Sequence, residues 1–114
     1  MAAPLEVVQT FVEAFNARDA AAVTPCFHSD AVIVGPDGSV MTRGGEAING
    51  LYAQLFTQSP DLHADIVSRM SVGSWVVDEE KVSGVVFEGF PSDLHDVSIY
   101  EVNDGLIVKL QLLT

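Results

Sequence analysis

The chain has 114 residues, of which 48% are hydrophobic and 18% are charged, and its 16 acidic and 5 basic residues give a formal net charge of −11. This length suits one domain that spans residues 1–114 and buries a substantial core, and it is too short for two ordinary domains. The negative charge argues against nucleic acid and anionic membranes as partners, because both repel an acidic protein.

The cysteine count and the first residues bear on the compartment in which the protein works. A single cysteine, Cys26, cannot form an internal disulfide, which suits a reducing compartment. The opening residues, MAAPLE, lack the basic stretch and apolar run of a signal peptide, and no segment has the length of a membrane span. We therefore expect a cytoplasmic protein.

Helical periodicity runs from Pro4 to Phe27. Apolar residues recur there at three- and four-residue spacing, which predicts an amphipathic helix. The pattern breaks at residues 16–19, and Asp19 is expected to cap a second, short helix that carries Phe27. The apolar stripe of the first helix consists of Val7, Val8, Phe11, Val12 and Phe15.

A strand and a third helix follow. The β-branched run at residues 31–34 predicts a strand that ends at the Gly-Pro-Asp-Gly turn of residues 35–38. The third helix is expected after Gly44 and Gly45, and Pro60 ends it. Its apolar stripe consists of Ala47, Ile48, Leu51, Tyr52, Leu55 and Phe56.

The remainder of the chain has the patterns of strands. We predict four of them, at residues 63–72, 75–86, 96–102 and 106–113, the second interrupted or turned at residues 78–81. The sequence Asn-Asp-Gly at 103–105 predicts a tight hairpin between the last two. No helix separates these strands, so the sheet should be mainly antiparallel. Helices across the mouth of a bent sheet form a cone, whose interior is a pocket.

Four segments of the chain resemble ketosteroid isomerases and SnoaL-like proteins of the NTF2-like superfamily. They are VQTFVEAFNARD at residues 8–19, FHSDAVIVGPDGS at 27–39, GGEAINGLY at 44–52 and YEVNDGLI at 100–107. The resemblance spans nearly the whole chain and implies a cone-shaped α+β NTF2-like fold, with three N-terminal helices packed on a curved, mainly antiparallel sheet. The fold alone does not give the function, because it serves isomerases, cyclases, dehydratases, hydrolases and binding proteins.

The resemblance also implies a homodimer. Sheets of this family pair back to back in such dimers. The strand face that carries Ser98 and Tyr100 is expected to be the covered one.

The catalytic positions of ketosteroid isomerases fall on residues that cannot do their chemistry. Phe11 stands where the family has a tyrosine donor, Gly35 where it has the aspartate base, and Val97 at or near the place of a second acid. With all three groups missing, we expect no useful turnover of a β,γ-unsaturated ketosteroid. The three histidines lack the spacing of metal ligands, so neither a metal nor a cofactor is expected.

Two other residues are catalytic candidates. His95 shares strand alternation with Val97 and Ile99, whose β-branched side chains predict the inward face. In a dry interior His95 could take a proton or accept a hydrogen bond, and the alternative is a histidine at the rim. Tyr52 lies on the apolar stripe of the third helix, where it serves either a structural hydrogen bond or the ligand.

Two acidic residues share one face of a predicted strand. Asp78 and Glu80 alternate with Val76 and Val82. If that face points inward, the two carboxyl groups could share a proton. Charged residues usually face solvent, so we expect a solvated turn or an exposed strand instead.

Two classes of function fit the sequence, with a third as the structural alternative. The first is a protein that binds a small apolar molecule, and the second is an isomerase, cyclase or dehydratase that acts on an apolar carbonyl, polyketide or terpenoid through His95, helped by Tyr52 or a carboxylate. The third is a dimeric interaction module with a filled core. The residues expected at the ligand pocket are Phe11, Phe15, Gly35, Phe56, Trp75 and Val97.

Overall fold

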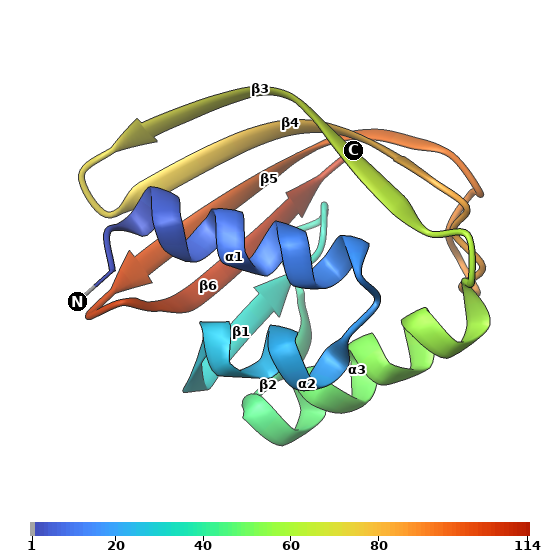
Figure 1. Cartoon of the computed structure of the whole chain (residues 1–114), viewed down its shortest axis with the longest axis horizontal. Coiled ribbons are helices and arrows are strands. Elements are labelled where there is room, and N and C mark those ends of the chain that lie inside the picture. Colours follow the sequence, from blue (N-terminus) through green and yellow to red (C-terminus); the bar gives the residue numbers. More distant parts are fainter. Residues whose placement is uncertain (1) are drawn as a thin grey trace.

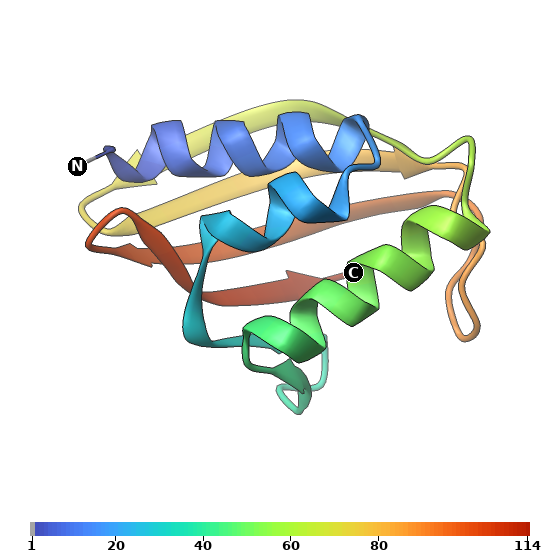
Figure 2. The ribbon, with the colours of Figure 1, turned by 60° about the horizontal axis from the view of Figure 1, so that its bottom comes forward.

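The computed structural model describes residues 2–114 and has three α-helices packed on one face of a six-stranded sheet (Figures 1 and 2). In chain order the elements are α1 (Pro4–Asn16), α2 (Ala20–Val23), the 3₁₀ turn η1 (Thr24–Cys26), β1 (Phe27–Val34), β2 (Val40–Arg43), α3 (Gly45–Gln58), β3 (His63–Val72), β4 (Trp75–Ser83), β5 (Leu94–Asn103) and β6 (Leu106–Leu113). The predicted α+β class is therefore confirmed.

The strands lie in the order β2-β1-β6-β5-β4-β3. Every neighbouring pair is antiparallel except β1 and β6, which confirms the expected mainly antiparallel sheet. Figure 1 shows the long strands β3 and β4 arching over α1. Strands β3 to β6 follow one another along the chain and lie side by side, as hairpin-connected strands do.

Each helix has the local signals that its sequence predicts. Pro4 opens α1, and the carboxylate of Glu6 accepts a hydrogen bond from the backbone N–H of Ala3 at 3.3 Å. Asp19 caps α2 by accepting from the N–H of Ala22 at 3.1 Å, as predicted. The second helix is shorter than expected and does not reach Phe27, because the chain tightens into η1 at residues 24–26.

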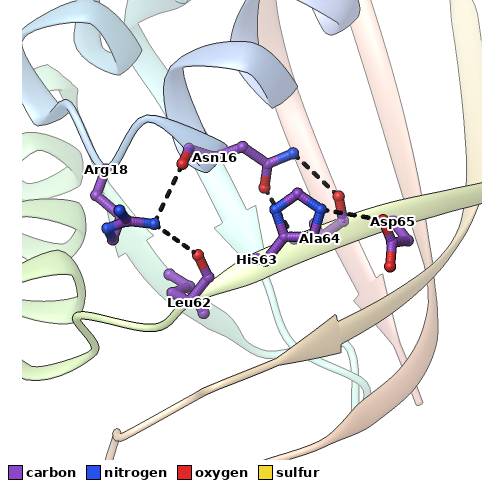
Figure 3. Close-up of polar contacts among 6 residues, drawn as sticks. All are labelled: Asn16, Arg18, Leu62, His63, Ala64 and Asp65. Carbon is purple, nitrogen blue, oxygen red and sulfur yellow. Dashed lines mark hydrogen bonds and ion pairs between the residues drawn. The ribbon is translucent and has the colours of Figure 1, made fainter.

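The end of α1 is tied to the start of β3 by backbone-directed side chains (Figure 3). Asn16 donates from Nδ2 to the Ala64 carbonyl at 3.0 Å and accepts at Oδ1 from the Ala64 N–H at 2.8 Å. The side-chain amide therefore forms the two hydrogen bonds that the backbone of a neighbouring strand would form with Ala64. Arg18 Nη1 donates to the carbonyls of Leu62 at 3.0 Å and Asn16 at 3.3 Å. These bonds fix the positions of Leu62 and Ala64, which line the cavity described below.

The hairpins differ from prediction at one place. The turn between β5 and β6 is confirmed, with left-handed φ values of 53° at Asp104 and 77° at Gly105, as a two-residue hairpin requires. The predicted interruption at residues 78–81 is wrong, because β4 continues through it without a break. Strand β4 ends instead at Ser83, just before Gly84, where φ is +74° and a Cβ atom would lie 2.3 Å from the Asp61 carbonyl oxygen.

Two further features complete the description. The short strand β2 was not predicted, and it pairs with β1 after the expected turn at residues 35–38. No helix in residues 2–114 is both long enough and apolar enough to cross a membrane.

Candidate functional site

A cavity of about 120 Å³ lies between the helices and the concave face of the sheet. Its apolar walls come from α1, α3, all six strands and the loop between β4 and β5. They consist of Phe11, Val12, Phe15, Ile33, Met41, Leu51, Leu55, Leu62, Ala64, Val82, Val85, Phe87, Phe90, Leu94, Leu110 and Leu112. Five polar residues also line it, namely Tyr52, Glu80, Asp96, Ser98 and Tyr100.

Two buried carboxyl groups face this cavity from neighbouring strands. Glu80 on β4 and Asp96 on β5 are direct cross-strand partners, and they are only 8% and 7% exposed. Ser98 Oγ donates to Glu80 Oε1 at 2.5 Å. Asp96 Oδ1 is buried and has no hydrogen-bond partner within residues 2–114. An acceptor in this state is costly unless a ligand or water satisfies it.

Burial sets the protonation of the pair. The pKa of Glu80 is raised to about 8, mainly by burial and in part by the negative charges of Asp96 and Asp78, while the hydrogen bond from Ser98 opposes the change. Burial also raises the pKa of Asp96, and its contact with Glu80 opposes the change. Both carboxyl groups therefore hold a proton more readily than exposed ones do, and their two protonation equilibria are linked.

Two phenol groups stand beside the carboxyl pair. Burial raises the pKa of Tyr52 and of Tyr100 above the ordinary value, and the negative charge of Glu80 is the next cause in both cases. Both phenols therefore stay protonated and can act as hydrogen-bond donors. Tyr100 lies on β5, two residues after Ser98, whose hydroxyl donates to Glu80 on β4.

A third buried acid lies outside the cavity lining. Asp78 is wholly buried and receives two hydrogen bonds from Arg69, from Nε at 2.6 Å and from Nη2 at 2.9 Å. Arg69 also donates from Nη1 to Gln9 Oε1 at 2.6 Å, which links β3 and β4 to α1. The planar, bidentate geometry makes this ion pair a structural connection between sheet and helix.

Several residues expected at the pocket are found there. Phe11, Phe15 and Tyr52 line the cavity. Phe56 is buried behind them, with its ring centroid 5.6 Å from that of Phe15 and 5.7 Å from that of Tyr52. Gly35 is buried next to Met41, which is itself a lining residue.

Two other residues expected at the pocket lie on the opposite face of the sheet. Trp75 is 42% exposed and pairs with Val72, and Val97 lies next to the exposed His95 rather than in the cavity. The positions expected for them are wrong, because the even-numbered residues of β4 and β5 face inward and the odd-numbered ones face outward. The acid that the structure does bury on β5 is Asp96, directly before Val97, the place at or near which a second acid was expected to be missing.

The same parity error affects His95. Its inward orientation was predicted from Val97 and Ile99, but the buried positions of β5 are Asp96, Ser98, Tyr100 and Val102. The His95 side chain is 59% exposed on the outer face, where Nε2 lies 2.7 Å from Glu79 Oε2. The expectation that Ser98 and Tyr100 face outward is wrong for the same reason, since both are 1% exposed.

The expectation that Asp78 and Glu80 face solvent is also wrong. Both side chains point inward, which was the alternative considered for this strand face. The signal was present in the sequence, because Val76 and Val82 frame the two acids on one strand face. The residues that satisfy the acids, Arg69 and Ser98, come from the neighbouring strands.

Comparison with known proteins places this geometry in context. The sequence model of the SnoaL-like domain family matches residues 8–110. A search of curated proteins finds no match. An uncharacterised cystatin-fold protein from Novosphingobium aromaticivorans has a TM-score of 0.89 and 23% identity over 100% of both chains.

Two further solved structures are similar over most of their length. A candidate polyketide cyclase from Sinorhizobium meliloti has a TM-score of 0.78 and 22% identity, covering 94% of this chain and 93% of its own. A protein of ketosteroid isomerase-like fold from Catenulispora acidiphila, solved in complex with trimethylamine, has a TM-score of 0.76 and 21% identity, covering 96% and 85%. At these identities the likeness establishes the fold.

Proposed function

This chain belongs to the SnoaL-like domain family, and from that premise we propose that it binds a small, largely apolar molecule in the cavity between helices and sheet. The observation that carries the proposal is Asp96 Oδ1, a buried acceptor without a partner on the wall of an apolar cavity. A ligand that brings a hydrogen-bond donor relieves the cost of that unsatisfied oxygen. The apolar remainder of the ligand is held by the aromatic and aliphatic walls.

The size of the cavity limits the ligand. Dry cavities of about 150 Å³ in other proteins hold a benzene ring. A volume of about 120 Å³ therefore suits a molecule of roughly one ring or a compact branched one. The relative from Catenulispora acidiphila was solved with trimethylamine, which is a ligand in this size class. In this proposal the helices close the mouth of a cone formed by the sheet.

A second candidate function is acid–base catalysis at the same place. Burial raises the pKa of Glu80 to about 8, which lies near the value that suits a general acid or base at neutral pH. Asp96 would accept a proton, Glu80 would return one, and the phenols of Tyr52 and Tyr100 would donate to a developing oxyanion. An isomerase, cyclase or dehydratase could use this arrangement in place of His95, and one structural neighbour is a candidate polyketide cyclase.

A purely structural module with a filled core is the weaker alternative. A cavity with an unsatisfied polar atom on its wall costs stability, and a protein without a ligand gains nothing from retaining it. The cavity and the unpartnered Asp96 oxygen therefore favour binding over a structural role.

Ligand binding can be tested by blocking the cavity. We expect thermal-shift screening with single-ring carbonyl compounds, phenols, amines and small terpenoids to yield compounds that raise the melting temperature. Val82→Phe puts a larger side chain into the cavity and should abolish that increase, whereas Val40→Phe, at a 51% exposed position of β2 outside the cavity lining, should keep it. Circular dichroism verifies that both variants fold. Equal responses in the two variants, or none in the wild type, would contradict the proposal.

We also propose a homodimer, formed by the outer face of the sheet. That face carries the apolar residues Met70, Val72, Trp75 and Val77, and the first three are 58%, 65% and 42% exposed. An apolar group on an open sheet face is typical of a surface that another subunit covers. Ser98 and Tyr100, which were expected to form this interface, lie on the opposite face.

The homodimer makes a prediction for molecular mass in solution. Sedimentation equilibrium should give a dimer for the wild type at micromolar concentration and a monomer for Val72→Glu, because a charge on the apolar face opposes its burial. Val40→Glu is the matched control, since Val40 is 51% exposed but lies on β2. It should remain dimeric. A monomeric wild type would refute the dimer.

A further inference from the structure

We propose that the ligand of this cavity is a small organic cation, namely a protonated amine of about one ring in size. The inference rests on the proposed function, and it adds the chemical class of the ligand. Three features of the cavity wall support it: the sign of its charges, its aromatic composition and the unsatisfied acceptor on Asp96.

The ionisable groups on the cavity wall other than phenols are acidic. Glu80 and Asp96 line it, and no Lys, Arg or His among residues 2–114 does. The guanidinium of Arg69, whose pKa is raised mainly by its hydrogen bonds to Asp78, is committed to that carboxylate. An anionic ligand would lie beside two carboxyl groups with no cation on the wall to offset its charge in a medium of low dielectric, which is unfavourable. The charge of the wall therefore selects neutral or cationic molecules.

Aromatic rings form a large part of the wall. The six that line the cavity are Phe11, Phe15, Tyr52, Phe87, Phe90 and Tyr100. The face of an aromatic ring carries a negative quadrupole that attracts an ammonium group placed over it. A neutral ligand gains contact area from these rings, whereas a cation gains the electrostatic attraction in addition. Aromatic rings beside a carboxylate are a combination that stabilises organic ammonium ions.

The unpartnered oxygen of Asp96 distinguishes further among ligands. A ketone or ether offers only acceptors, so it leaves Asp96 Oδ1 unsatisfied. A hydroxyl can donate to this oxygen, but an ammonium group forms the shorter and stronger charge-assisted bond. Burial of the ammonium charge is costly, and the carboxylate directly beside it offsets that cost. The net charge of −11 also raises the local concentration of cations around the protein.

The test compares three probes of nearly equal shape: benzylamine, benzyl alcohol and benzoate. Isothermal titration calorimetry at pH 7 should give benzylamine an affinity about tenfold or more above that of benzyl alcohol, with no binding of benzoate. The same comparison with isobutylamine and isobutanol covers a smaller ligand. Asp96→Asn should lower the affinity for benzylamine by about tenfold or more and change the affinity for benzyl alcohol by less than about threefold.

The control removes an equal charge elsewhere. Asp104 lies in the exposed turn between β5 and β6, at the other end of β5 from Asp96. Asp104→Asn should leave both affinities unchanged. If the alcohols bind as tightly as the amines, or if Asp104→Asn weakens the amines as much as Asp96→Asn, the inference is overturned while the proposed cavity binding stands. If no probe of either size binds, both are overturned. The ranking in the wild type decides the inference even if a variant fails to fold.

Discussion

Replacing Arg69 by methionine is expected to lower the free energy of unfolding by about 3 to 5 kcal/mol. Asp78 has no exposed surface, and both of its carboxylate oxygens are bound by the Arg69 guanidinium at 2.6 and 2.9 Å. Methionine keeps the length of the arginine stem but leaves the carboxylate buried without a partner. Urea denaturation at pH 7, followed by circular dichroism, measures the loss.

The double variant Arg69→Met/Asp78→Leu separates the ion pair from its surroundings. Removing both charges leaves no unpaired group, so the double variant should recover most of the stability lost in Arg69→Met. Such recovery identifies the unpaired carboxylate as the cause. A single variant that loses less than about 1 kcal/mol, or a double variant no more stable than the single one, would contradict this role for the pair.

The free energy of unfolding is also expected to fall as the pH rises from about 4.5 to about 8, with Glu80 as the main cause. Burial raises the pKa of Glu80 in the folded state, so over this interval the folded protein binds more protons than the unfolded chain does. The stability must therefore decrease with rising pH and become level above the folded-state value. The decrease should be roughly 2 to 4 kcal/mol.

Glu80→Gln isolates this contribution. Its amide keeps an acceptor for Ser98 and has a donor for Asp96, but it does not titrate. The variant should show a flatter dependence of stability on pH and be more stable than the wild type at pH 8. Urea denaturation at half-unit pH steps measures both profiles. If the two profiles have the same slope, Glu80 titrates as an ordinary solvated carboxylate and its burial at the cavity wall is wrong.

The architecture was predictable because its signals are local. The bounds of β3 and β6 were predicted at the residues where the structure has them, and the 103–105 turn has the sequence that two left-handed residues require. The first helix follows from its apolar periodicity together with Pro4. Each of these features depends on neighbours a few residues away in the chain.

The site was harder to predict because its chemistry reverses the usual distribution of residues. On β5 the inward positions include Asp96 and Ser98, while the outward ones include Val97 and Ile99. Alternation assigned the apolar pair to the interior, and since side chains alternate with a period of two, that choice placed every residue of the strand on the wrong face. The polar interior belongs to the cavity, and the apolar exterior belongs to the face proposed to dimerise.

Pairing between strands was the second source of difficulty. Asp78 and Glu80 are stable inside because Arg69 on β3 and Ser98 on β5 satisfy them. The register that brings these residues together is a property of the assembled sheet. The sequence of β4 alone could place both acids on one face, but it could not show that hydrogen-bond partners for them lie on the neighbouring strands.

The central claim, that Glu80 and Asp96 form a buried and coupled carboxyl pair at a ligand cavity, is tested most directly by carboxyl ¹³C NMR. The two side chains should titrate above the ordinary carboxyl range, in steps that depend on each other. Saturating benzylamine or benzyl alcohol should shift both resonances while leaving the exposed Asp104 unchanged. Resonances of Glu80 and Asp96 that titrate at ordinary carboxyl values and ignore every ligand would contradict the account.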